Sequence, residues 1–285
     1  DGLSKQRLDT PFIKINNKLQ RVSWDKAFEV INSQISKISN ENCVGVVGNQ
    51  VENEAIFAFR ELFKKLNLNK ILPFQKKLTF SKENRANYLF NSKIEGLDKC
   101  DYLLLIGANP RVDSAILNAR IRKNYIHRDL KISSISSQKF DLKFNYEYLG
   151  SDVKILTSIL EKKHEISNDF EKANFPMIII GDEVLQNDSS LDVQKVSTSI
   201  LKKFGGFKKN WNGFNILHNY ASTVGAIDIL SEYSDYNHSA FKNDINKNLI
   251  KFVYLLNADD FDFDVSNCFV IYQGHHGDKG AQLAD

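Results

Sequence analysis

Two adjacent histidines are the residues of this 285-residue sequence whose types most suggest chemistry. His275 and His276 precede Asp278, and imidazole and carboxylate groups are both common metal ligands. Neighbouring side chains of an extended segment point to opposite faces, and a zinc site needs about four ligands. We therefore interpret this segment as a polar turn at the end of a strand, and assign no metal-binding residue to it.

His218 is the other histidine that could act as a base. It follows an apolar stretch and lies near Trp211 in the sequence. A histidine in such surroundings is more often a buried core or interface residue than a catalytic group. The sequence also lacks the G-x-S-x-G pattern of a nucleophile elbow, so we assign no catalytic residue.

The glycine pattern argues against the common nucleotide-binding motifs. Gly45 and Gly48 are spaced G-x-x-G, but the third glycine of a dinucleotide fingerprint does not follow. The sequence contains no G-x-x-x-x-G-K-[ST] motif. We therefore assign no cofactor-binding residue.

Three cysteines, Cys43, Cys100 and Cys268, lie far apart in the sequence without a C-x-x-C pair. This usage is typical of a reducing compartment. Three isolated thiols cannot supply the roughly four thiolates that an iron–sulfur cluster usually takes. Each cysteine opens or closely precedes an apolar run, so we expect small buried side chains at strand starts.

Polar turns follow several apolar runs, and these turns are the remaining candidate sites. In an open α/β sheet, ligands bind at the carboxyl ends of the strands. The four turns are Gly48-Asn49-Gln50, Gly107-Ala108-Asn109-Pro110, Asn257-Ala258-Asp259 and the segment 273–278. Each of them could also be a simple chain reversal.

The stretch 101–123 shows how such a turn is positioned. Residues 102–106 are an apolar run of strand length, Gly107 and Pro110 mark a turn, and Asp113 can cap the helix that follows. A strand, a turn and an amphipathic helix form the repeating unit of an α/β sheet.

The same unit recurs along the chain, which predicts a mostly parallel sheet with helices on both faces. We expect a hairpin at 12–22 and a polar surface loop at 231–248. The other expected strands are at 43–47, 71–74, 130–135, 176–180, 249–256 and 268–272. The expected helices are at 24–38, 52–68, 82–91, 152–163, 191–204, 214–218 and 221–230, and in the second half of 101–123.

Composition excludes several classes of function. The net charge is +3 with both signs interspersed, and a nucleic-acid-binding protein would show a basic stripe, so we expect no nucleic acid partner. Hydrophobic residues make up 42% of the chain, enough for a core. No apolar run reaches the roughly 18 residues of a membrane span.

Several segments, in order, resemble the molybdopterin-oxidoreductase-like region of one family, the large iron–sulfur subunit of respiratory complex I. The ordered set spans the whole chain, although each segment alone is weak. The segments are DGLSKQRL (1–8), SWDKA (23–27), RANYLFN (85–91), LIGANPRVDSAILNARIRK (105–123), NILH (215–218) and IYQGHHGDKGA (271–281).

The resemblance implies a molybdopterin-oxidoreductase type fold with two interleaved Rossmann-like lobes, here truncated. Residues 1–42 would form an N-terminal hairpin and helix, and residues 43–285 the molybdopterin-oxidoreductase-like domain. Lobe one would take about 43–80 plus 207–285, and lobe two about 82–204. The sequence stops at Asp285 where the family continues, so we expect a partner to cover the sheet.

The resemblance also implies a non-catalytic structural piece of the peripheral arm of NADH:ubiquinone oxidoreductase, supporting the iron–sulfur electron path from NADH to quinone. No cofactor is expected in this chain, because the clusters belong to a missing N-terminal part or a partner subunit. Partners would be other peripheral-arm subunits, especially the chain with the N-terminal iron–sulfur domain. Arg111 and residues 120–123 would then serve the fold and subunit contacts.

The implied location is the matrix side of the mitochondrial inner membrane, or the cytoplasmic side of a bacterial inner membrane. Two alternatives stay open. The chain could be a fragment of an active molybdopterin-dependent oxidoreductase, or a free nucleotide-binding α/β protein.

Overall fold

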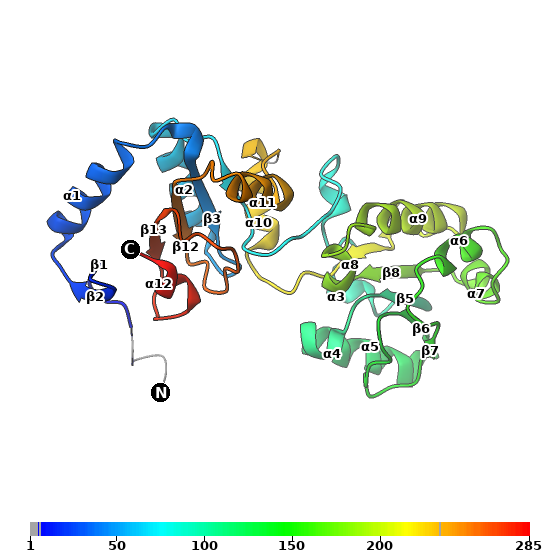
Figure 1. Cartoon of the computed structure of the whole chain (residues 1–285). Coiled ribbons are helices and arrows are strands. Elements are labelled where there is room, and N and C mark those ends of the chain that lie inside the picture. The colour runs from blue at the N-terminus through cyan, green and yellow to red at the C-terminus, as the bar shows by residue number, and fades with distance from the viewer. Residues whose placement is uncertain (1–4, 6, 234) are drawn as a thin grey trace. The chain divides into compact units, whose positions relative to one another are not determined.

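The computed structural model describes residues 5, 7–233 and 235–285 (Figure 1). Most of the resembling segment at 1–8 therefore lies outside the described residues. The chain forms two compact units, which we call unit 1 (Asp1–Lys77 and Tyr220–Asp285) and unit 2 (Leu78–Asn219). Each unit contains its own parallel sheet.

The sheet of unit 1 has the strand order β13-β12-β3-β4. The strands are β3 (Cys43–Val47), β4 (Ile71–Leu72), β12 (Phe252–Leu256) and β13 (Phe269–Gln273), and all neighbours are parallel. Central strand β3 is buried along its whole length, which explains why its sequence is a continuous apolar run without alternation.

Helices cover both faces of this sheet. On one face, Phe241 of α11 (His238–Asn246) packs with Val44 and Val253. On the other face, Phe59 and Phe63 of α2 (Asn53–Lys65) lie against Gly45, where a Cβ atom would come within 2.6 Å of the Phe63 ring. Glycine at position 45 is therefore needed for helix–sheet packing.

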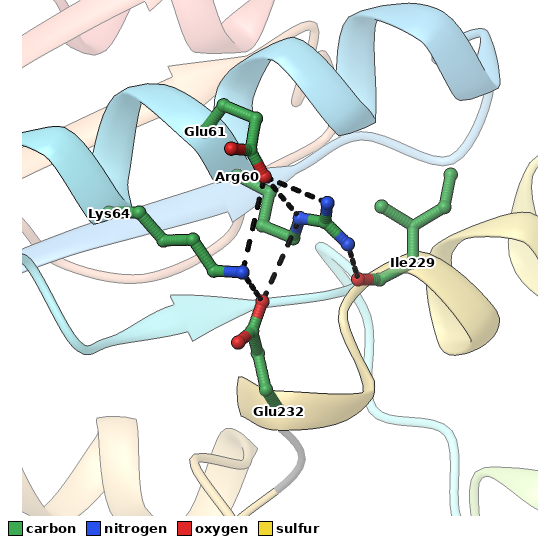
Figure 2. A network of polar contacts seen from close by, with 5 residues as sticks. All are labelled: Arg60, Glu61, Lys64, Ile229 and Glu232. Atoms are coloured by element: carbon green, nitrogen blue, oxygen red, sulfur yellow. Dashed lines mark hydrogen bonds and ion pairs between the residues drawn. The ribbon is translucent and has the colours of Figure 1, made fainter.

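A polar network joins α2 to the returning chain of unit 1 at α10 (Thr223–Ile229) and the 3₁₀ turn η3 (Ser231–Tyr233). Figure 2 shows Arg60 donating to a Glu61 carboxylate oxygen (Nη2–Oε1 2.7 Å) and to the Ile229 carbonyl (Nη1–O 3.3 Å). Lys64 pairs with Glu232 (Nζ–Oε1 2.8 Å). The groups are partly exposed, so the network orients α10 more than it stabilises the unit.

The amino-terminal part of unit 1 has the expected hairpin and helix. Strands β1 (Phe12–Ile15) and β2 (Lys18–Arg21) flank Asn16 and Asn17, which both have positive φ, as a two-residue hairpin turn requires. Ser23 caps α1 (Trp24–Ile35) by accepting a hydrogen bond from the Lys26 backbone N–H. The remaining elements are η1 (Asn40–Asn42) and α12 (Lys279–Leu283).

The sheet of unit 2 has the order β11-β8-β5-β6-β7, again with parallel neighbours. Its strands are β5 (Tyr102–Ile106), β6 (Lys131–Ile135), β7 (Glu147–Tyr148), β8 (Pro176–Ile180) and β11 (Phe214–Ile216). Strands β5 and β8 lie at its centre and are buried throughout.

Helices again cover both faces. Leu117 and Ile121 of α5 (Ala115–Arg128) pack with Leu103 and Met177 on one face. On the other face the ring centroid of Tyr102 lies 4.6 Å from that of Phe170 of α7 (Ser167–Lys172). The other elements are η2 (Arg85–Asn87), α3 (Lys93–Gly96), α4 (Pro110–Asp113), α6 (Ile155–Leu160), α8 (Asp182–Leu185), α9 (Ser190–Lys203), β9 (Phe207–Lys208) and β10 (Trp211–Asn212).

Three local predictions are wrong. The sequence predicts a helix at 214–218, but 214–216 is strand β11, because it pairs with β8 at the sheet edge. The segment 82–91 contains only the short turn η2. The expected loop at 231–248 contains η3 and α11, because Asn237 caps a helix whose Phe241 is buried in the core.

The predicted α/β architecture with parallel sheets is confirmed. The segment 207–219, which the resemblance places in lobe one, lies in unit 2 through the β11–β8 pairing. The rest of the domain division stays a prediction. Among the described residues, no helix is both long and apolar enough to cross a bilayer.

Candidate functional site

Three of the four candidate turns lie at one edge of the sheet in unit 1. The turns after β3, β12 and β13 are neighbours because these strands are adjacent and parallel. The fourth turn, after β5, belongs to unit 2. The structure therefore offers two separate carboxyl edges, and we describe each on its own.

At the edge of unit 1, the space between β3 and β12 is closed by backbone. This is where the strand order reverses, the usual ligand position in an open α/β sheet. A Cβ atom at Gly48 would lie 1.8 Å from the Asn257 carbonyl oxygen, and the Gly48 N–H donates to the Leu256 carbonyl (2.8 Å). Asn257 has positive φ (47°), which lets the two turns meet.

The acidic residues of this edge are already used in internal contacts. Buried Gln75 donates to Asp259 (Nε2–Oδ1 2.9 Å) and accepts from the Asp260 backbone N–H (3.1 Å). Asp260 also pairs with Lys76 and with Lys279 (Nζ–Oδ1 2.7 Å). The Lys279 and Lys76 partners lower the pKa of Asp260 to about 2, so this carboxylate is ionised and bound at neutral pH.

The segment around the paired histidines serves chain packing. His275 accepts a backbone hydrogen bond from Leu8 (3.0 Å), and the Nδ1 atoms of His275 and His276 are 2.6 Å apart. Asp278 caps α12 by accepting from the Ala281 N–H (3.1 Å) and accepts a hydrogen bond from the Tyr272 hydroxyl (2.5 Å). Among the described residues, no group of three or more His, Cys, Asp or Glu side chains could hold a metal ion.

At the edge of unit 2, the turn after β5 meets the turn after β8. A Cβ atom at Gly181 would lie 2.4 Å from the Gly107 carbonyl oxygen. Gly107 has positive φ (57°), as a sharp turn after a strand requires. Asn109 donates its backbone N–H to Asp113 (N–Oδ2 2.9 Å), so Asp113 stabilises the turn rather than capping α5 as the sequence predicted.

Burial raises the pKa of two carboxyl groups at this edge, those of Asp113 and of Asp182, a residue that is not among the candidates named from the sequence. The Asp182 side chain is 4% exposed, and neither carboxylate oxygen has a hydrogen-bond partner of normal geometry in the described chain. Burial, with a smaller contribution from the Asp113 charge, raises its pKa to about 6, while the nearby Asn219 N–H opposes the rise. The sequence does indicate this position as a candidate, because Gly181-Asp182 directly follows the apolar run 176–180, as the other candidate turns follow theirs.

Neither of the two half-buried histidines, His218 and His238, is placed as a catalytic base. One ring nitrogen of His218 lies 2.7 Å from the Tyr88 carbonyl oxygen, and burial lowers the pKa of its imidazole. Its ring contacts Phe80. His238, which the sequence did not nominate, is half-buried at the start of α11, and burial lowers its pKa to about 4.

The cysteines lie at the opposite edges of the sheets. Cys43 begins β3, Cys100 precedes β5, and Cys268 precedes β13. Burial raises the pKa of the Cys43 and Cys268 thiols to about 11. Burial also raises the pKa of the Cys100 thiol well above its usual range. These thiols are protonated at neutral pH, and each lies at the amino end of a strand, opposite the carboxyl edge of its own sheet.

Comparison with known proteins identifies related chains. The family model described as molybdopterin oxidoreductase matches residues 7–285. An NADH-quinone oxidoreductase subunit of Rickettsia prowazekii is 39% identical over 290 residues, which cover 100% of this chain and 41% of that protein. The NADH-ubiquinone oxidoreductase 75 kDa subunit of Reclinomonas americana is 38% identical over 301 residues, covering 100% of this chain and 43% of that protein.

The chain thus spans about two fifths of the length of these curated relatives. Among solved structures, acetylene hydratase from Pelobacter acetylenicus is similar in fold, with a TM-score of 0.52 and 14% sequence identity. The match covers 99% of this chain and 55% of that one. The resemblance read from the sequence segments is confirmed along the whole chain.

Proposed function

The chain belongs to the molybdopterin oxidoreductase family, and from this premise we propose that it is a non-catalytic structural part of an NADH–quinone oxidoreductase. It lies in the peripheral arm and supports the iron–sulfur electron path from NADH to quinone. The clusters are held by polypeptide outside these residues, and the partners are the other peripheral-arm subunits. The assembly is attached to a mitochondrial or bacterial inner membrane.

The observation that carries this proposal is the closed state of both carboxyl edges. Backbone atoms of Gly48 and Asn257 meet in unit 1, and those of Gly107 and Gly181 meet in unit 2. A pterin or nucleotide in either crevice would have to displace main chain, and the acidic groups beside the crevice of unit 1 are largely bound to lysine and glutamine.

The donor set also fits a molybdopterin metal centre poorly. Such a centre in an active enzyme takes a cysteine, selenocysteine or serine ligand from the protein. All three thiols lie at the amino edges and are protonated, so they are poor metal ligands as placed. The residues present therefore favour a scaffold over the alternative of an active molybdopterin enzyme.

The experiment that tests the proposal is purification of the intact assembly in mild detergent, followed by a native gel. We expect this chain to migrate with NADH dehydrogenase activity and to be found in that band by mass spectrometry. Molybdenum and tungsten in the band should be far below one atom per chain, with iron from the same sample as the positive control.

Two results would overturn the proposal. One atom of molybdenum or tungsten per chain would restore the active-enzyme alternative. A stable monomer that migrates apart from the activity and binds NADH in calorimetry would support the free nucleotide-binding protein instead.

A further inference from the structure

A groove of about 650 Å³ lies beside α5 in unit 2. One wall is the carboxyl-terminal half of α5, with Tyr125 and Ile126, and the other is the loop 139–146 between β6 and β7. The loop contributes Phe144 and Tyr146, and the ring centroids of Tyr125 and Phe144 are 6.0 Å apart. The groove is therefore lined by aromatic and aliphatic side chains.

Side-chain hydrogen bonds from α4 and α5 to backbone carbonyl groups of the loop fix the shape of the groove. Asn118 donates to Leu142 (Nδ2–O 3.1 Å), Arg122 to Lys143 (Nε–O 3.2 Å) and Arg111 to Asp141 (Nη1–O 2.8 Å). Lys143 has positive φ (64°), a conformation that is unfavourable for a residue with a side chain and persists only where neighbouring groups hold it. A groove fixed in this way loses little entropy when it binds a ligand.

Large apolar side chains are also exposed on α4 and α5, the two helices whose Arg111 and Asn118 bind the loop. Val112 is 77% exposed, Ile116 is 79% exposed, and Ile126 at the groove is 50% exposed. Scattered apolar side chains are normal on a surface, but here three accompany an aromatic groove. This combination is typical of a protein interaction site.

The charge around the groove is positive. Arg122 and Lys139 make no ion pair with any residue of the described chain. The one acidic residue in the lining, Asp141, is already paired with Arg111 (2.5 Å) and Lys143 (2.6 Å). The sequence of α5 contains no acidic residue, so Arg122 has no carboxylate partner within its own helix.

We propose that this groove, with Tyr125, Ile126, Phe144 and Tyr146 as its lining and Arg122 and Lys139 as its cations, binds a segment of a partner subunit that presents apolar or aromatic side chains flanked by carboxylates. The proposal rests on the proposed function, because the partner is another subunit of the oxidoreductase. Arginine and tyrosine are among the residues that most often dominate such contacts.

The test uses the full chain in cells that assemble the oxidoreductase. The variant Arg122→Glu with Lys139→Glu places two carboxylates opposite the carboxylates of the partner. We expect the fraction of chain that migrates with NADH dehydrogenase activity to fall about tenfold or more. The matched control, Lys195→Glu with Lys202→Glu, makes the same charge change on α9, which covers the other face of the sheet, and should assemble normally.

A second variant separates loss of partner binding from a folding defect, because Arg122 also donates a hydrogen bond to the loop. Lys139→Glu with Ile126→Ser leaves the Arg122–Lys143 bond intact and should show the same loss, with a thermal melting curve like that of the unaltered chain. A photo-crosslinking residue at position 126 should link, in the assembled complex, to a segment of another subunit that contains acidic and apolar residues.

A direct probe is a fluorescent peptide of alternating glutamate with leucine and phenylalanine, added to the isolated full chain. It should bind the unaltered chain about tenfold more tightly than the groove variants, and a lysine-for-glutamate version should not bind. Displacement by inorganic phosphate or ATP at similar concentration would overturn the proposal in favour of a small-anion site. A crosslink to a second copy of this chain would overturn it in favour of self-association.

Normal assembly of both groove variants would also overturn the proposal and would leave the scaffold function standing. Failure of the scaffold function has a different signature, because the unaltered chain itself would then migrate apart from the NADH dehydrogenase activity.

Discussion

Asp182 is a buried carboxyl group that has no cationic partner, and only the nearby Asn219 N–H favours its charged form. Its pKa of about 6 lies above the value near 3.8 that an unfolded chain gives it. The folded state binds the Asp182 proton more tightly than the unfolded state does. The contribution of this carboxyl group to the stability of the fold is therefore full below about pH 3.8, and it is lost as the pH rises through 6. A difference of about two pH units corresponds to about 3 kcal/mol.

We therefore expect Asp182→Asn to raise the free energy of unfolding at pH 7.5 by about 1 to 3 kcal/mol, because no buried charge remains. As the pH rises from 4 to 6, the free energy of unfolding of Asp182→Asn should fall less than that of the unaltered chain. Urea unfolding at several pH values measures both effects, with the exposed Asp262→Asn as control. Equal pH profiles for the unaltered chain and Asp182→Asn would mean that the carboxyl group titrates normally.

At the scale of elements, the contact between the turns after β3 and β12 holds the sheet of unit 1 closed at its carboxyl edge. It depends on Gly48, since any Cβ atom there would overlap the Asn257 carbonyl group. The strands on either side are fully paired, so the backbone can move aside only by breaking ladder hydrogen bonds.

Gly48→Ala should lower the free energy of unfolding by about 3 kcal/mol or more, because the overlap is with backbone and not with a flexible side chain. Gly277→Ala is the matched control, since a Cβ atom there meets nothing within 4 Å. Thermal unfolding of both variants measures the difference. If the two variants melted together, the edge would be open enough to admit a ligand, and the scaffold proposal would lose its main support.

At the scale of the whole molecule, unit 2 is one continuous stretch whereas unit 1 combines two. A continuous unit with its own sheet and core can fold alone. Strand β11 completes this sheet, and its residues Phe214 and Ile216 are buried beside β8.

We expect a fragment of residues 78–219 to unfold cooperatively, as measured by calorimetry. A fragment of residues 82–204, the lobe that the sequence suggested, should melt about 10 °C lower or fail to fold, because it exposes the edge of β8. Equal stability of the two fragments would show that β11 contributes nothing to this unit.

The long buried strands, the helices α1, α2, α5, α6, α9 and α10, and the family could be predicted from the amino-acid sequence. Continuous apolar runs such as 102–106 and 176–180, each closed by glycine, encode buried parallel strands through near neighbours in the chain. The ordered segments from 23–27 to 271–281 carried the resemblance that the comparisons confirm. Periodicity and turn chemistry are local properties, so they are readable without the fold.

Which of these local patterns contact one another depends on the three-dimensional arrangement of the chain. The segment 214–218 is too short to distinguish helix from strand, and its pairing with β8 made the choice. Asp182 is perturbed because the turn after β8 is buried beside Asp113, and the groove exists because loop carbonyl groups bind α5. Such contacts join residues far apart in the chain, so their energies depend on strand order and burial, which local sequence does not encode.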